Sequence, residues 1–152
     1  MDATTATITF EIAGDAIPQP RARATRSGRM YTPTKNGIDV FKQAIALRAA
    51  MEAKRRGWVF TTGAVEIFVE CVFARPRSHV NAAGGLRATA PAFPGHGCGD
   101  WDNLAKGVQD AITKTGALWN DDTQVIDGRC RKRYAMPGEP ARTIITIRRP
   151  DA

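Results

Sequence analysis

The chain has 152 residues, 43% of them hydrophobic and 7% aromatic, which indicates a single domain (residues 1–152) with a hydrophobic core and excludes a disordered protein. No apolar run approaches the roughly 20 residues of a membrane-spanning helix, and no basic leader precedes an apolar stretch. We therefore expect a cytoplasmic protein that has no membrane partner. The formal net charge of +7 favours a polyanionic partner such as nucleic acid, although charge alone fits a merely soluble basic protein equally well.

A strand is predicted over residues 5–12, because Ile8, Phe10 and Ile12 alternate with polar residues. An arginine-rich loop follows at residues 17–33, where prolines and a glycine interrupt regular structure. No acid occurs between residues 16 and 38. The candidate DNA-binding residues of this region are basic or aromatic: Arg21, Arg23, Arg26, Arg29, Tyr31 and Lys35. For Tyr31, stacking on a base and anchoring of the loop both stay open.

A helix is predicted over residues 36–56, with Asn36 as its N-cap and Gly57 as its stop. Its core stripe is apolar at helical spacing and consists of Ile38, Phe41, Ile45 and Ala49. Its opposite face is basic, with Lys42, Arg48, Lys54, Arg55 and Arg56. Either a solvated surface or a DNA contact explains that face.

The second half of the chain begins with an alternating segment at residues 64–73, which predicts an interior strand because both of its faces are partly apolar. A long loop at residues 75–99 leads directly into an acidic stretch, which favours a functional loop. The remaining predicted elements are a helix over 102–115, a strand over 123–134, a turn over 135–140 and a closing strand over 142–148.

Three widely spaced cysteines, Cys71, Cys98 and Cys130, do not form the pattern of a disulfide framework. Cys98 lies near His96 and not far from His79, so these three side chains offer part of a zinc site. No paired ligand spacing supports that site, and buried or half-buried cysteines are the alternative.

Acidic residues gather around the second predicted helix. Asp100 and Asp102 are two positions apart and share a face if the chain enters the helix in an extended conformation, with Asp102 as the N-cap. Lys106 lies one turn after Asp102. It either pairs with Asp110 or presents a cation to a phosphate group.

Two more carboxylates, Asp121 and Asp122, follow the helix. Adjacent carboxylates repel each other unless they are solvated or share a cation, and Mg²⁺ prefers oxygen ligands. A helix followed by a returning strand allows acids from both helix ends to meet. The spacing therefore fits a metal site, and it fits a series of caps and turns equally well.

The motifs DWDNLAK (100–106), DA (110–111) and DDTQV (121–125) resemble the RusA family of Holliday-junction resolvases. The basic segment PRARATRSGRMYTP (20–33) resembles the arginine-rich entry of that family, so the resemblance covers residues 18–134. It implies an α+β domain in which a mixed β-sheet is packed by two main helices. It also implies a bacterial or phage-encoded homodimer that cuts four-way DNA junctions with Mg²⁺, or alternatively Mn²⁺, as cofactor.

The resemblance also assigns roles to residues of this chain. It implies that the metal-binding and catalytic carboxylates are Asp100, Asp102 and Asp122, with Asp121 as a further metal candidate, and that the catalytic lysine is Lys106. Two positions depart from the family pattern. Gly99 stands where proline is common, and Trp101 stands where an aliphatic residue is common and either wedges against a base or fills a pocket.

Two other functions fit the same residues. One is a structure-selective or non-specific Mg²⁺ nuclease, because recognition of a branch depends on dimer geometry that a sequence does not reveal. The other is a non-catalytic DNA-binding module, which predicts few and dispersed acids, whereas the acids of this chain are clustered.

Overall fold

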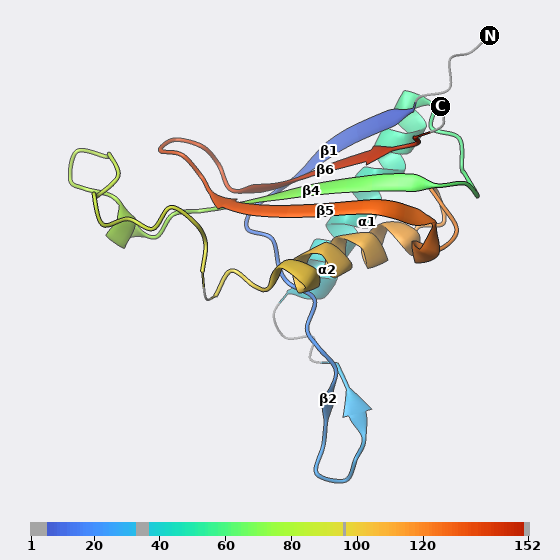
Figure 1. Cartoon of the computed structure of the whole chain (residues 1–152), viewed down its shortest axis with the longest axis horizontal. Coiled ribbons are helices and arrows are strands. Elements are labelled where there is room, and N and C mark those ends of the chain that lie inside the picture. The colour runs from blue at the N-terminus through green and yellow to red at the C-terminus, as the bar shows by residue number, and fades with distance from the viewer. Residues whose placement is uncertain (1–5, 33–36, 96, 151–152) are drawn as a thin grey trace.

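The computed structural model describes residues 6–32, 37–95 and 97–150, and it shows a β-sheet with two helices packed on the same face (Figure 1). The strands are β1 (Thr7–Ala13), β2 (Arg23–Ala24), β3 (Met30–Tyr31), β4 (Val65–Phe73), β5 (Val125–Tyr134) and β6 (Arg142–Arg148). The helices are α1 (Ile38–Arg56) and α2 (Trp101–Thr113), with short 3-10 turns η1 (Arg77–His79) and η2 (Asp122–Gln124). This arrangement confirms the predicted α+β class with a mixed sheet and two main helices.

The main sheet has the strand order β1-β6-β4-β5, so β4 is an interior strand, as predicted. β1 and β4 each run antiparallel to β6, whereas β4 and β5 are parallel. Two parallel neighbours need a crossover connection, and here α2 lies within it. As a result, α2 starts near the end of β5 and finishes near its beginning.

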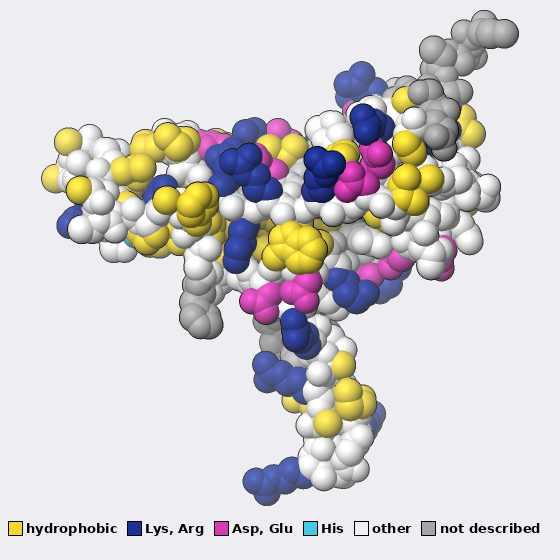
Figure 2. All heavy atoms as spheres, viewed as in Figure 1, with side chains coloured by type: hydrophobic (Ala, Val, Ile, Leu, Met, Phe, Trp, Pro, Cys, Tyr) yellow, Lys and Arg dark blue, Asp and Glu magenta, His cyan; other side chains and the backbone are white. Residues whose placement is uncertain are grey.

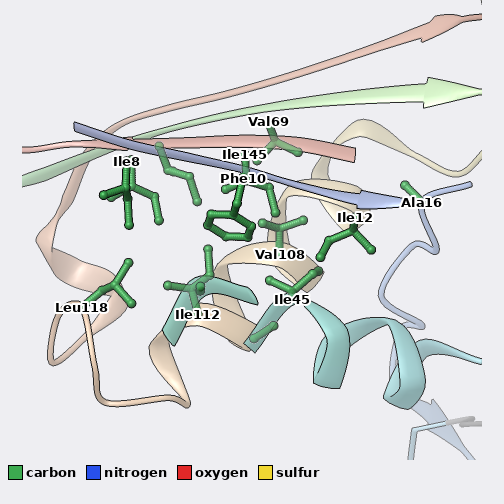
Figure 3. Packing of buried hydrophobic residues seen from close by; sticks show 14 of the residues in the cluster. Ile8, Phe10, Ile12, Ala16, Ile45, Val69, Val108, Ile112, Leu118 and Ile145 are labelled. Atoms are coloured by element: carbon green, nitrogen blue, oxygen red, sulfur yellow. The ribbon is translucent and has the colours of Figure 1, made fainter. Parts of the chain in front are cut away.

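The hydrophobic core lies between the sheet and the two helices (Figure 3). Ile8 and Phe10 of β1 pair with Ile147 and Ile145 of β6, and all four side chains are buried on the helix side. Ile45 of α1 is also fully buried in this cluster. Burial of each such side chain stabilises the fold by about 1.5–3 kcal/mol, so the alternating and helical stripes of the sequence position both helices on the sheet.

The opposite face of the sheet carries charged residues that pair across strands. Arg148 of β6 donates to Glu66 of β4 at 2.5 Å, and Arg133 of β5 donates to Glu70 of β4 at 3.1 Å. These acids offset the charge of the arginines beside them.

The arginine-rich segment, predicted as a loop, contains a short hairpin instead. Arg23 and Ala24 pair antiparallel with Tyr31 and Met30, and the turn closes through a hydrogen bond from the Thr25 amide to the Arg29 carbonyl at 2.8 Å. We call residues 20–32 the basic arm. Figure 1 shows that the hairpin projects away from both the sheet and the helices.

The predicted N-cap of the second helix, Asp102, was wrong by two residues. The N-cap is Asp100, with extended dihedral angles as expected for the lead-in, while Asp102 lies in the first turn. No side-chain hydrogen bond caps this helix, so capping preference did not decide where it begins. For the first helix, the N-cap is Gly37, and the predicted cap Asn36 lies outside the described residues.

The long loop at residues 75–99 forms a projection of its own at one end of the sheet (Figure 1). It contains the turn η1 and an isolated bridge between Val80 and Leu86. The side chain of Arg75 lies over the ring of Tyr134, with its guanidinium carbon 4.8 Å from the ring centre. The loop is therefore anchored to the end of β5.

Within the described residues, no helix is long and apolar enough to cross a membrane.

Candidate active site

Asp100 and Asp102, which we call the acid pair, lie side by side at the start of α2. Arg21 at the base of the basic arm reaches both of them, with its Nη2 atom 3.2 Å from Asp102 Oδ2 and 3.9 Å from Asp100 Oδ2. The side chains of Asp100 and Asp102 are 75% and 55% exposed. An ion pair this exposed contributes at most about 1 kcal/mol, so Arg21 is readily displaced by a better cation.

The backbone that leads into the acid pair is held on two sides. Lys132 of β5 donates to the carbonyl of Gly99 at 2.9 Å, and the amide of Gln19 donates to the carbonyl of Asn103 at 3.0 Å. Gly99 has a φ of +90°, and a Cβ atom there would lie 2.7 Å from the Pro18 ring. Glycine is therefore strongly favoured at position 99.

Lys106 lies one turn after Asp102 on the same helix. Its Nζ atom is 3.2 Å from Asp110 Oδ1, which confirms the predicted structural pair, and its side chain is 62% exposed. Lys42 also approaches Asp110, at 3.8 Å, and donates to Gln19 at 2.9 Å. The side chain of Lys42 is only 14% exposed, so it does not belong to the solvated basic face of the first helix.

Asp122 lies at the opposite end of α2 from the acid pair. Its Oδ1 atom accepts a hydrogen bond from the hydroxyl of Thr113, the last residue of the helix. At about 1.5 Å of rise per residue, Thr113 is about 16 Å along the helix from Asp102. The single chain therefore brings Asp100 and Asp102 together but does not bring Asp122 to them.

Asp121 has a local structural role. Its side chain accepts a hydrogen bond from the amide of Thr123 at 2.8 Å, and the side chain of Gln124 accepts one from the amide of Asp121 at 2.9 Å. The N–H group of Thr123 lowers the pKa of the Asp121 carboxyl. This reciprocal capping box starts η2, which shows that part of the acidic pattern consists of caps and turns.

The basic arm adjoins the acid pair. Arg23, Arg26, Arg29 and Tyr31 are all exposed on it, while Lys35 lies outside the described residues. Figure 2 shows Lys and Arg side chains along the projecting hairpin and Asp and Glu side chains where it joins the domain. A cationic projection beside two carboxylates can hold a phosphate backbone close to an acidic centre.

Comparison with known proteins bears on this geometry. The family model for endodeoxyribonuclease RusA matches residues 13–148. The chain belongs to the RusA family. The match spans the basic arm, α2 and the strands that follow, and it is to a family of enzymes that cut DNA internally. Curated proteins gave no match.

The donor set of this RusA-family site suits a hard divalent cation. Asp100 and Asp102 present oxygen atoms alone, and Mg²⁺ is commonly held by one or two carboxylates together with water and a substrate phosphate. Within residues 6–32, 37–95 and 97–150, no three His, Cys, Asp or Glu side chains form a group that could hold a metal ion. Within the described residues, the acid pair alone therefore does not make a complete metal site.

The zinc alternative has little support from the described residues. His79 and Cys98 both approach Tyr134, the former with its ring edge-to-face at 5.2 Å between centroids. Burial raises the pKa of the Cys98 thiol, which disfavours the thiolate that binds zinc. His96 lies outside the described residues.

Sequence reasoning missed the contribution of β5 to this RusA-family site. Cys130 and Lys132 contact the start of α2: the indole N–H of Trp101 donates to the Cys130 carbonyl at 2.8 Å, and Lys132 holds Gly99. The register of the parallel pair places Lys132 opposite the buried Cys71, on the helix side of the sheet. The sequence holds one indication of this role. Successive side chains of a strand point to opposite faces of the sheet, so Lys132 must face the helices if its arginine neighbours at 131 and 133 face away from them.

Proposed function

We propose that this RusA-family protein resolves four-way DNA junctions by paired, symmetric nicks, with Mg²⁺ as cofactor and Mn²⁺ as a substitute. The observation that supports the proposal best is the acid pair at the base of the basic arm, in a chain of an endodeoxyribonuclease family. The arm grips the phosphate backbone, and the acid pair lies where a gripped strand passes into the domain. Such an activity belongs to DNA recombination and repair in the cytoplasm of a bacterium, whether host- or phage-encoded.

In this mechanism, Asp100 and Asp102 would hold the metal ion, which would supply an activated water and offset charge on the scissile phosphate. Arg21 leaves Asp102 and contacts a phosphate oxygen instead. Lys106 leaves Asp110 and places its ammonium group beside the phosphate, where it stabilises the negative charge that develops in the transition state. Both cations are exposed, so breaking either ion pair costs little free energy.

We further propose that the active unit is a homodimer in which the acid pair of one subunit is joined by Asp122 of the partner subunit. Within one chain, Asp122 is held by Thr113 at the far end of α2 and is too distant to share an ion with Asp102. Two antiparallel helices related by a two-fold axis place opposite ends next to each other. The same axis gives two matched sites, as paired cutting requires.

Cleavage of a synthetic four-way junction and of linear duplex, each with Mg²⁺ or EDTA, tests the activity. Wild-type protein should nick the junction symmetrically in Mg²⁺ but not in EDTA. The Asp102→Asn variant should bind the junction without cutting it. Asp127→Asn is the matched control, because Asp127 pairs with Arg129 on strand β5 away from the acid pair. Equal cutting of both DNAs would indicate a non-specific Mg²⁺ nuclease, and junction binding without cutting in any divalent ion would indicate a DNA-binding module.

Subunit mixing tests the shared site. Asp102→Asn and Asp122→Asn should each be inactive as homodimers. If Asp122 acts across the interface, a mixed dimer contains one site with both substitutions and one site with neither, so mixing the two inactive proteins should restore nicking of one strand. If each site uses residues of a single subunit, every site in the mixture is damaged and no activity returns.

A further inference from the structure

Trp101 is the most exposed of the three tryptophans in the chain. In the sequence it lies between Asp100 and Asp102, the acid pair. It is 55% exposed, whereas Trp58 and Trp119 are 8% and 0% exposed. We propose that the indole of Trp101 is a stacking platform for a nucleobase at a DNA branch point, and that it makes the site selective for branched DNA. This inference rests on the proposed function, because it assigns a specificity-determining residue to the same site.

The polar edge of the indole is held within the protein. Its N–H group donates to the carbonyl of Cys130 at 2.8 Å, which ties the first turn of α2 to β5. An indole has no other polar group, so its hydrogen-bonding capacity is satisfied within the protein. Its apolar ring nevertheless remains more than half exposed. A fixed aromatic surface loses little conformational entropy when a base stacks on it.

The charges around the ring suit a nucleotide. Two cations contact the residues next to Trp101 in the chain: Arg21 lies 3.2 Å from Asp102, and Lys132 lies 2.9 Å from the Gly99 carbonyl. A base on the ring therefore places its phosphates near two cations and near the acid pair that is proposed to hold the metal ion. Proteins bind unpaired nucleic acid through this combination of basic groups and aromatic platforms.

Stacking on Trp101 discriminates between DNA structures. In a continuous duplex, neighbouring pairs cover both faces of every base pair, so a protein ring gains no stacking without first opening the helix. At a branch point the stack is interrupted and a base face becomes available. A stacking residue therefore adds affinity for a junction and adds little for linear duplex, whereas the basic arm contacts the phosphates of both.

The test compares Trp101→Ala, Trp101→Leu and Trp101→Phe. Affinities for a four-way junction and for a linear duplex with the same kind of ends are measured by fluorescence anisotropy in Ca²⁺, which suppresses cutting. The ratio of junction affinity to duplex affinity should fall by about 5-fold to about 150-fold in the Ala and Leu variants. Phe should restore most of the ratio, because it keeps an aromatic ring on which a base can stack. It lacks the N–H group that ties α2 to Cys130, so this variant separates the effect of the ring from the effect of that hydrogen bond.

Phe93→Ala is the matched control, because Phe93 is 74% exposed on the long loop and should leave the ratio unchanged. Junction binding should also quench the fluorescence of the exposed Trp101, and this quenching should disappear in Trp101→Phe. An unchanged ratio in Trp101→Ala, or a Phe variant as impaired as the Ala variant, would overturn the inference while junction cutting by the wild type still supported the proposed function. Failure of the wild type to cut any junction would instead refute the function.

Discussion

Replacement of Thr113 by valine should loosen Asp122, because Thr113 is the middle member of a hydrogen-bond chain. The indole N–H of Trp119 donates to the Thr113 hydroxyl at 2.7 Å, and this hydroxyl donates to Asp122. An indole N–H only donates, so the hydroxyl must accept from Trp119 and direct its single hydrogen at the carboxylate. Trp119 is fully buried, which fixes the chain to the core.

The expected loss of stability follows from the hydrogen bond that valine cannot make. Valine has the shape of threonine but cannot accept a hydrogen bond, so the buried indole N–H of Trp119 loses its partner. An unsatisfied buried donor costs about 1–3 kcal/mol. Asp122 is only half-buried, and water replaces the bond that it loses. For a domain of this size, a loss of about 2 kcal/mol lowers Tm by about 4–8 °C.

Thermal unfolding followed by circular dichroism measures this loss, with Thr113→Ser as the control that keeps the hydroxyl and should unfold near the wild-type temperature. In a Trp119→Phe background, which has no indole N–H, Thr113→Val should cost much less. An equal cost in both backgrounds would show that the hydrogen-bond chain does not exist. Nicking should fall in Thr113→Val but not fall further when Asp122→Asn is already present, because Thr113 acts through Asp122.

Three other predictions concern neighbouring features. Arg21→Ala should tighten Mn²⁺ binding, measured by electron paramagnetic resonance, by about 1.4-fold to 5-fold because a competing cation is removed; weaker binding would show that Arg21 helps to hold the metal. Hydrogen bonds from Arg133 lower the pKa of Glu139 from 4.5 to about 2, so the stability from this pair is complete above about pH 4.5 and is lost as the pH falls towards 2. Glu139→Gln should therefore flatten the decrease of Tm over this acidic range, and an unchanged slope would contradict the pairing. Gly99→Ala should lower Tm by about 2–8 °C, because a positive φ costs about 1–2 kcal/mol with a side chain and the new methyl group meets the proline ring; an unchanged Tm would show that this turn is not constrained.

Local periodicity was sufficient to predict most of the fold. The closing strand at 142–148 was predicted at its observed bounds, and the strand at 64–73 and the helix at 36–56 were each predicted within two residues of their observed limits. The helix buries one regular stripe, which includes Ile38, Phe41 and Ile45. Where one face of an element is buried, the sequence pattern and the structure carry the same information.

The start of α2 was predicted less well because distant residues determine it. Asp102 is a good capping residue, and capping preference placed the helix start there. In the structure, Pro18 packs on Gly99, and Lys132 holds the Gly99 carbonyl. Trp101 is tied to β5 and becomes the first helical residue. These contacts join segments that are far apart in the chain, so no local pattern reveals them.

The expectation that acids from both ends of α2 meet fails within one chain for a topological reason. β5 is parallel to β4, so the chain must travel the whole length of α2, about 20 Å for 13 residues, before β5 begins. Asp122 directly precedes β5 and therefore stays at the end of α2, beside Thr113. The part of β5 that returns to the acid pair is its second half, with Cys130 and Lys132. A site that unites Asp102 with Asp122 thus requires a second copy of the chain, and this geometry ties the proposed metal site to the proposed dimer.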